Sequence, residues 1–202
     1  NGSSRKLQKS GKLPHDYLLR NNGDGTFKDV TAEAGLGDME WSWGCGVGDY
    51  DNDGNPDLYV TNWGPNRLYH NSGNGTFTDV AEKAGVATPK WPLPKWSTGA
   101  TFGDYDNDGL LDLYVVNFVT FDYQPDRPAL NPNSPCKYKQ IPTPCAPEHY
   151  DGQPDLLYHN NGDGTFKEVS RAAGIIEEPA GRGFTPIFSD LDNDGDQDLY
   201  VA

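Results

Sequence analysis

The sequence predicts an all-β protein built from about three similar blades, each made of four short antiparallel strands. Three observations support this prediction. The 202-residue chain repeats one pattern three times. Each copy contains brief runs of aromatic and β-branched residues, which are typical of strands. No stretch has the length and the apolar spacing of a long helix. Four short strands in a repeat of about 50 residues are typical of a β-propeller blade.

The first half of each repeat predicts a hairpin followed by one turn of helix. Two strand-like runs flank a sequence of the Asn-Gly-Asp-Gly type, whose residues tolerate the positive φ angles of a tight turn. A short segment that ends in glycine follows, and glycine is a common C-terminal stop of a helical turn. The three copies occupy residues 16–36, 66–86 and 155–175.

The second half of each repeat predicts two further strands joined by an acidic loop. Apolar residues alternate in these strands, which places every second side chain in a core. The strand before the loop is predicted at residues 43–47, 98–102 and 184–188, and the strand after it has the sequence Asp-Leu-Tyr-Val. We assign one repeat domain, 1–202, with blade-like units at 13–65, 66–119 and 154–202 and a proline-rich insertion at 120–153.

Each acidic loop has the pattern D-x-D-x-D-G-x-x-D and predicts a calcium site. Four carboxylates so close together repel one another unless a cation lies between them. The glycine permits a sharp turn, and hard oxygen donors favour calcium over zinc or copper. One backbone carbonyl per loop completes each set of ligands for about three Ca²⁺ ions. The predicted ligands are Asp49, Asp51, Asp53, Asn55 and Asp57; Asp104, Asp106, Asp108, Leu110 and Asp112; and Asp190, Asp192, Asp194, Asp196 and Asp198.

Other classes of protein fit the sequence less well. An EF-hand needs a bidentate glutamate at position twelve of its loop, where this chain has Val60, Val115 and Val201. The formal net charge of −14 argues against a nucleic-acid phosphate binder. No apolar run approaches the roughly 20 residues of a transmembrane helix, and residues 1–17 lack an apolar leader segment. Motifs such as HExxH, GxSxG and the P-loop are absent, so we expect no enzyme.

The repeated blocks L-Y-H-N-x-G-x-G-T-F-x-D-V and G-D-Y-D-N-D-G-x-x-D-L-Y-V resemble FG-GAP/VCBS repeats, over about residues 13–119 and 154–202. Such repeats form integrin α-subunit propellers and occur in the ASPIC/UnbV group of secreted proteins related to cartilage acidic protein 1. The resemblance implies calcium in acidic loops that join the outer strand of one blade to the inner strand of the next. It also implies a secreted adhesion, scaffold or protein-binding module. The FG-GAP dipeptide itself is absent, and Ser189 replaces the usual glycine.

The cysteines and tryptophans leave alternatives open. Cys136 and Cys145 lie in the insertion, where related secreted proteins have a similar cysteine pair, which implies a disulfide; two reduced thiols are the alternative. Cys45 aligns with Ala100 and Pro186, so we expect a small buried residue, with a reactive thiol or an intermolecular disulfide as the alternative. Trp91 and Trp96 predict either packing between blades or a platform for a sugar or protein ligand.

Three blades are fewer than the four to eight of a closed propeller. We therefore expect a homo-oligomer or a part of a larger chain, because exposed edge strands recruit partners. The first alternative function is a self-assembling subunit of an extracellular filament or surface layer. The second is a carbohydrate-binding or catalytic propeller.

Overall fold

The computed structural model describes residues 16–37, 41–88, 95–120, 136–139, 141–142, 149–175 and 180–202, and it confirms the all-β fold. Within these residues, the helical turn α2 (Ala81–Ala84) accompanies the strands. The strands are β1 (Leu19–Asn21), β2 (Phe27–Asp29), β3 (Trp41–Gly48), β4 (Asp57–Trp63), β5 (Arg67–Asn71), β6 (Phe77–Asp79), β7 (Ser97–Gly103), β8 (Asp112–Asn117), β9 (Lys137–Tyr138), β10 (Ile141–Pro142), β11 (Leu156–Asn160), β12 (Phe166–Glu168), β13 (Pro186–Ser189) and β14 (Asp198–Val201).

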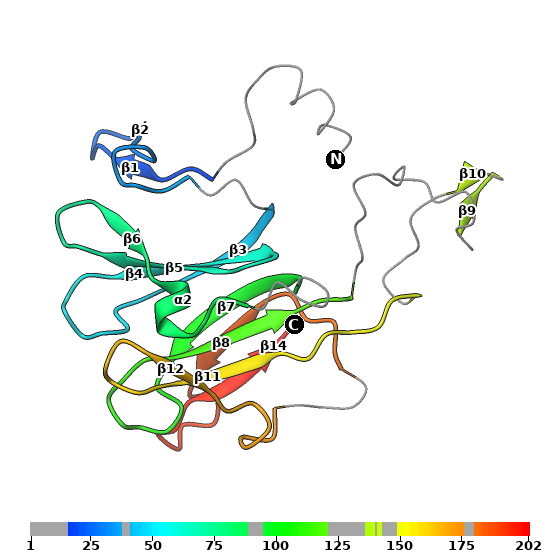
Figure 1. The fold of residues 1–202 in the computed structure, drawn as a ribbon. Helices are drawn as coiled ribbons and strands as arrows, with labels where there is room; N and C mark the ends of the chain where they lie inside the picture. Colours follow the sequence, from blue (N-terminus) through cyan, green and yellow to red (C-terminus); the bar gives the residue numbers. More distant parts are fainter. Residues whose placement is uncertain are drawn as a thin grey trace.

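Two complete antiparallel blades form the middle of the molecule. Their strand orders are β3-β4-β5-β6 and β7-β8-β11-β12. The hairpin β1–β2 lies at one end of this row and the pair β13–β14 at the other (Figure 1). Each complete blade thus combines the second half of one sequence repeat with the first half of the next. The pair β9–β10 forms a separate two-stranded sheet within the insertion.

The hairpins have the turn chemistry that the sequence predicts. In the β5–β6 turn, Gly73 and Gly75 have φ angles of 72° and 86°, which L-residues with a side chain rarely adopt. The side-chain oxygen of Asn74 accepts hydrogen bonds from the amide and the hydroxyl of Thr76. The helical turn α2 follows and ends at Gly85, whose φ of 79° is the expected left-handed stop.

The main core lies between the two complete blades. Tyr59 and Leu68 of the first blade and Leu113 and Val115 of the second are fully buried in one cluster. The rings of Tyr50 and Phe166 meet across the blades, with centroids 5.6 Å apart. Apolar side chains of neighbouring blades therefore bury one another, as expected for an array of blades that cannot form a core singly.

The first strands of successive blades, β3 and β7, approach closely because their facing residues are small. A Cβ atom added at Gly44 would lie 2.6 Å from the carbonyl oxygen of Thr98 and 3.2 Å from the Cα of Gly99. One added at Gly46 would lie 3.0 Å from the carbonyl oxygen of Ala100. The glycines of β3 thus set the distance between the blades.

Replacing Gly44 by alanine will destabilise the protein by roughly 1–3 kcal/mol, because the added methyl group overpacks two backbones that cannot easily move. Urea unfolding measures this as a lower midpoint. Gly181→Ala is the matched control, because a Cβ at Gly181 meets no atom within 4 Å. Equal midpoints for the two variants would contradict the close approach of β3 and β7.

The structure corrects the expectation for Cys45 and leaves others untested. Cys45 is exposed on the outer face of β3, and it is a free thiol. It is not buried because β3 begins the first complete blade, and no described strand covers that face. Cys145 lies outside the described residues, so the Cys136–Cys145 disulfide stays a prediction. Trp91 also lies outside them, and its role stays a prediction. In the described part of the chain, no helix is long and apolar enough to cross a membrane.

Candidate metal centres

Each acidic loop joins the first and second strands of a blade. The loops connect β3 to β4, β7 to β8 and β13 to β14. The resemblance implied loops between the outer strand of one blade and the inner strand of the next, and this expectation is wrong. The strands on either side of each loop pair directly, so the loop is a long hairpin turn. All three loops therefore lie at the same end of their blades.

Backbone amides orient the carboxylates of the first loop. Asp49 accepts hydrogen bonds from the amides of Asp53 (3.0 Å) and Gly54 (2.9 Å). The carboxylate of Asp53 accepts one from the amide of Asn55 (2.8 Å). The chain makes this tight curl with positive φ angles at Asn52 (56°) and Gly54 (89°). Amide donors thus fix the first and fifth carboxylates before any ion binds.

The other two loops repeat this geometry. Asp104 accepts from the amides of Asp108 and Gly109, and Asp190 accepts from those of Asp194 and Gly195. The left-handed residues recur as well, at Asn107, Gly109, Asn193 and Gly195. Neighbouring loops also touch. The side-chain amide of Asn52 donates to the carbonyl oxygen of Gly109, and that of Asn107 donates to the carboxylate of Asp196.

Three carboxylates converge in every loop. In each trio, one oxygen per residue lies within 4.8 Å of the others. Such a set of hard, negatively charged oxygens fits calcium. The trios are Asp49, Asp51 and Asp53; Asp104, Asp106 and Asp108; and Asp190, Asp192 and Asp194. These are nine of the predicted ligands. The carbonyls of Asn55, Leu110 and Asp196 stay predictions.

The ninth-position carboxylates, Asp57 and Asp112, are fully buried at the start of β4 and β8. The two oxygens of Asp57 accept hydrogen bonds from the amides of Tyr50 (3.2 Å) and Asn71 (2.8 Å). Burial raises the pKa of Asp57, and it raises the pKa of Asp112 from 3.8 to about 6. Each buried carboxyl therefore ties the acidic loop to the outer hairpin of the same blade.

The raised pKa of Asp112 predicts opposite effects of acid with and without calcium. The folded carboxyl binds its proton more tightly than the unfolded one. The free energy of unfolding of the calcium-free protein therefore gains a contribution as the pH falls from about 6 towards 4. With calcium, acid displaces the ion and stability falls.

This pH effect can be isolated with Asp112→Asn, which keeps an oxygen acceptor but does not titrate. The difference in Tm between the wild type and the variant is measured at pH 7 and pH 5, in EDTA and in calcium. In EDTA, the Tm of the wild type relative to that of the variant should be higher at pH 5 than at pH 7. In calcium, it should be lower at pH 5 than at pH 7. A Tm difference that does not change with pH would contradict the raised pKa of Asp112.

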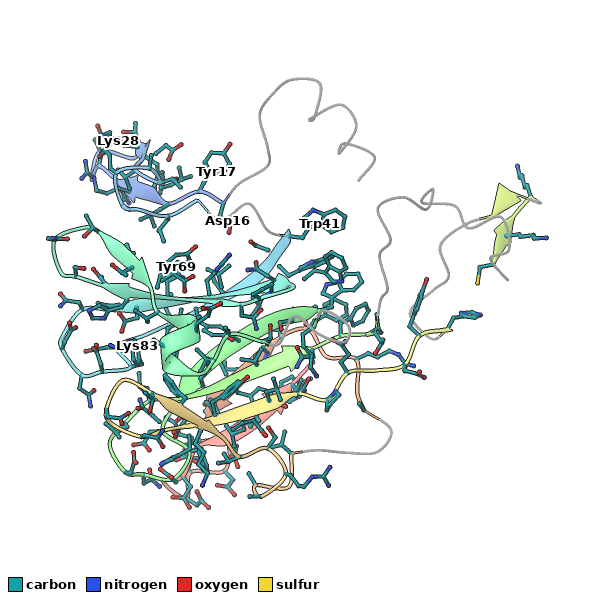
Figure 2. The ribbon with its side chains drawn as sticks, in the orientation of Figure 1. Asp16, Tyr17, Lys28, Trp41, Tyr69 and Lys83 are labelled. Carbon is teal, nitrogen blue, oxygen red and sulfur yellow. The ribbon has the colours of Figure 1, made fainter. Side chains whose placement is uncertain are left out.

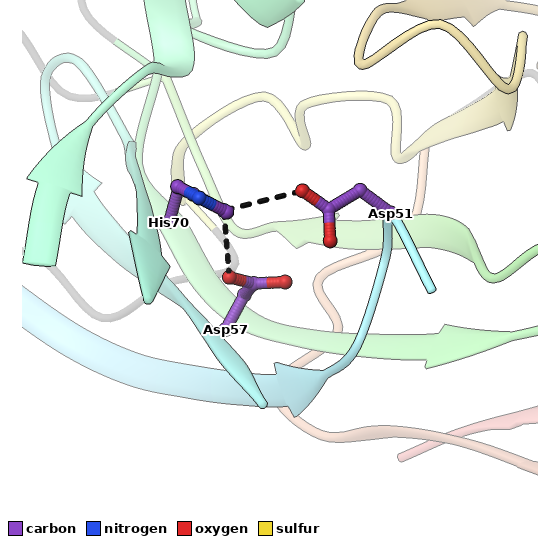
Figure 3. A group of neighbouring side chains, drawn as sticks. All are labelled: Asp51, Asp57 and His70. Carbon is purple, nitrogen blue, oxygen red and sulfur yellow. Dashed lines mark ion pairs between the residues drawn. The ribbon is translucent and has the colours of Figure 1, made fainter. Parts of the chain in front are cut away.

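Two histidines, His70 and His159, also lie at the site. The Nδ1 atom of His70 lies 3.2 Å from an oxygen of Asp51 and 3.3 Å from one of Asp57 (Figure 3). His159 has the same relation to Asp106 and Asp112, at 3.2 and 3.4 Å. Both Nδ1 atoms are buried and make these close contacts without a hydrogen bond. Each imidazole thus bridges the third and ninth positions of its loop.

The signal for these histidines was the recurrence of His-Asn in two of the three hairpins. The asparagine supplies the amide that Asp57 or Asp112 accepts, so the adjacent histidine must lie near the loop. In the first hairpin, Arg20 occupies the histidine position. The third loop differs from the other two, because its ninth-position residue, Asp198, is exposed.

Trp96 packs between aromatic side chains near the opposite end of the blades. Its ring lies 5.1 Å from that of Trp43 on β3 and 5.4 Å from that of Phe118, measured between centroids. These contacts agree with the interpretation that Trp96 packs between blades. They leave its predicted role as a ligand platform untested.

Comparison with known proteins identifies the repeats. An FG-GAP-like repeat model matches residues 9–60, 49–115 and 148–201. Cartilage acidic protein 1 of Homo sapiens is 28% identical over 189 residues, which are 93% of this chain and 24% of that protein. The Xenopus tropicalis protein of the same name is 29% identical over 93% of this chain and 25% of its own length. The chain thus spans about a quarter of the length of these relatives. The three repeat matches and the blades that they form show that the chain belongs to the FG-GAP-like repeat family.

Proposed function

We propose that this chain is a secreted calcium-binding repeat module that serves adhesion, scaffolding or protein binding. The observation that carries the proposal is the recurrence of one carboxylate trio in three loops, each held by the same pair of backbone amides. In each loop, three carboxylates converge although they repel one another. A divalent cation that lies between the three carboxylates offsets this repulsion.

Calcium would act on the architecture of the molecule. The first, third and fifth aspartates of each loop hold the ion, and amide hydrogen bonds keep the first and fifth in place. The ion offsets the repulsion between carboxylates and so stabilises the turn between the first two strands of each blade. Because neighbouring loops touch through Asn52 and Asn107, this stabilisation extends from one blade to the next.

A secreted location suits this chemistry. Free calcium is abundant outside cells and scarce in the cytosol, and a disulfide between Cys136 and Cys145 would form in the same oxidising compartment. The relatives in several vertebrates carry the name cartilage acidic protein 1, and this chain is likewise acidic, with a net charge of −14. We propose no catalytic role, because the carboxylates and histidines that cluster in the described residues recur with the repeat.

Isothermal titration calorimetry with single-loop variants tests the proposal. The wild type should bind three calcium ions, and Asp53→Asn, Asp108→Asn and Asp194→Asn should each lose one. Asparagine keeps the size and an oxygen acceptor, so the loop fold is preserved. Asp163→Asn is the matched control, since this exposed aspartate caps a hairpin turn and belongs to no trio. Full binding by all three loop variants would contradict the proposal.

A further inference from the structure

A second kind of metal-ligand cluster lies beside the first two acidic loops. One oxygen each of Asp51 and Asp57 and one nitrogen of His70 all lie within 4.8 Å of one another (Figure 3). The carboxylate trios offer only oxygen atoms, whereas this cluster adds an imidazole nitrogen. The second loop has the same cluster, made of Asp106, Asp112 and His159. We call these two sets the His-Asp-Asp clusters.

Strand β5 aims His70 at the acidic loop. Tyr69, the residue before it, lines a hollow with Leu18 and lies on the side of the blade that faces the β1–β2 hairpin (Figure 2). Successive side chains of a strand point to opposite faces, so His70 points away from this hairpin. Its ring stands nearly perpendicular to that of Tyr50, with centroids 6.4 Å apart. The rings of His159 and Tyr105 repeat this contact at 6.3 Å.

The imidazole nitrogen that faces the carboxylates makes no hydrogen bond. Within the described residues, the Nδ1 atoms of His70 and His159 are both buried without a hydrogen-bond partner. A buried polar atom in this state costs free energy, so native proteins rarely leave one. Two blades share this feature at the same position. It therefore points to a bound group that the protein chain does not supply.

The distances fit a zinc ion shared by the three side chains. The Nδ1 atom of His70 lies 3.2 Å from an oxygen of Asp51 and 3.3 Å from one of Asp57. The second cluster has 3.2 and 3.4 Å. Two ligands bound tetrahedrally at about 2.0–2.1 Å from one zinc ion lie roughly 3.3–3.4 Å apart. Calcium prefers oxygen donors, whereas zinc takes imidazole and carboxylate together.

Amide donors hold the buried carboxylate of each cluster in place. The two oxygens of Asp57 accept hydrogen bonds from the amides of Tyr50 and Asn71. Asp112 accepts equivalent bonds in the second blade. Donors behind a metal ligand fix its orientation and strengthen metal binding. The buried carboxylates are therefore oriented before an ion arrives.

Charge balance also allows a second cation beside calcium. The first loop carries four carboxylates, at Asp49, Asp51, Asp53 and Asp57. One calcium ion in the trio offsets two of these charges, and a second divalent cation offsets the other two. The side chains of His70 and Asp51 are 30% and 27% exposed, so an ion can reach the cluster from solvent.

We propose that each of the two His-Asp-Asp clusters binds one zinc ion or a similar divalent transition metal. Three protein ligands leave a fourth position for water or an external ligand. The third acidic loop, residues 190–198, contains no histidine, so the chain binds two zinc ions. The clusters share Asp51 and Asp106 with the calcium trios, but zinc binding does not require calcium.

Isothermal titration calorimetry with zinc tests these sites. The protein is held in saturating calcium and carries Cys45→Ser, which removes the exposed thiol as a competing ligand. It should bind two zinc ions, His70→Gln and His159→Gln should each bind one, and the double variant should bind none. His149→Gln is the matched control and should bind two, because His149 belongs to no metal-ligand cluster. No zinc binding, or two zinc ions bound by the double variant, would overturn the proposal.

Crossed variants separate this inference from the calcium proposal. Asp53 and Asp108 belong to the calcium trios but not to the His-Asp-Asp clusters. Asp53→Asn should therefore lose one calcium ion and keep two zinc ions, whereas His70→Gln should lose one zinc ion and keep three calcium ions. Loss of zinc together with calcium in Asp53→Asn and Asp108→Asn would overturn a zinc site distinct from the calcium site. Loss of calcium binding alone in the wild type would contradict only the calcium proposal.

Nitrogen NMR of protein with isotope-labelled histidine tests the ligand atom without a substitution at the site. Zinc should shift the Nδ1 resonances of His70 and His159, because these atoms face the carboxylates. The resonances of His149 should not change. Unshifted Nδ1 resonances at both cluster histidines in excess zinc would overturn the proposal.

Discussion

Excess EDTA will lower the Tm of the protein strongly. An ion that binds only the folded state stabilises it by about 2.7 kcal/mol per site when its concentration is 100 times Kd. For a chain of about 200 residues, each kcal/mol corresponds to roughly 2–4 °C. Loss of calcium from one loop should thus lower the Tm by roughly 5–10 °C, and loss from all three loops by more. Differential scanning calorimetry in calcium and in EDTA measures the effect.

A matched control separates calcium from non-specific effects of the chelator. The triple variant Asp53→Asn, Asp108→Asn and Asp194→Asn removes one carboxylate from each trio and should respond little to EDTA. Magnesium at the same concentration should restore less of the wild-type Tm than calcium does, since it prefers fewer protein ligands. A wild-type Tm that is the same in calcium and in EDTA would contradict calcium-dependent stability.

Replacing Leu68 by alanine will destabilise the protein by about 2–5 kcal/mol, because it leaves a cavity in the core between the two complete blades. Leu68 on β5 is fully buried in the cluster that also contains Tyr59 and Leu113. The loss should exceed that of any single surface substitution. Chemical denaturation in saturating calcium measures the free energy of unfolding without a contribution from ion loss.

Leu191→Ala is the control for this core substitution. Leu191 is 61% exposed, so its truncation removes the same atoms from a site that water already reaches. The control should change the free energy of unfolding by less than about 0.5 kcal/mol. If Leu68→Ala and Leu191→Ala had equal effects, the core would not lie between these blades.

Local features of the fold could be predicted from the sequence because they recur in each of the three repeats. The turn residues Gly73 and Gly75 predict the β5–β6 hairpin, which the structure contains. The alternation of apolar residues predicts buried positions such as Leu113, which is fully buried. The trios of aspartates also followed from spacing alone, because alternate residues of a tight curl face one centre. These inferences need contacts only between residues that are close in the sequence.

Features that depend on neighbouring blades could not be predicted in the same way. The exposure of Cys45 follows from the position of β3 at the start of the first complete blade, whereas its repeat counterpart Ala100 is covered by β3. The position of His70 depends on β4–β5 pairing, which brings it to Asp57 from 13 positions away in the chain. The expectation that each acidic loop connects one blade to the next is wrong, because each blade combines the second half of one sequence repeat with the first half of the following one.

A crystal structure grown in calcium tests the central claim most directly. Anomalous difference density should show three peaks, one at each trio, bounded by Asp49, Asp51 and Asp53 in the first loop and by the corresponding aspartates in the others. Soaking crystals in EDTA should remove all three peaks. Loops that show no peak in saturating calcium, with their carboxylates turned apart into solvent, would contradict the claim that calcium holds these blades together.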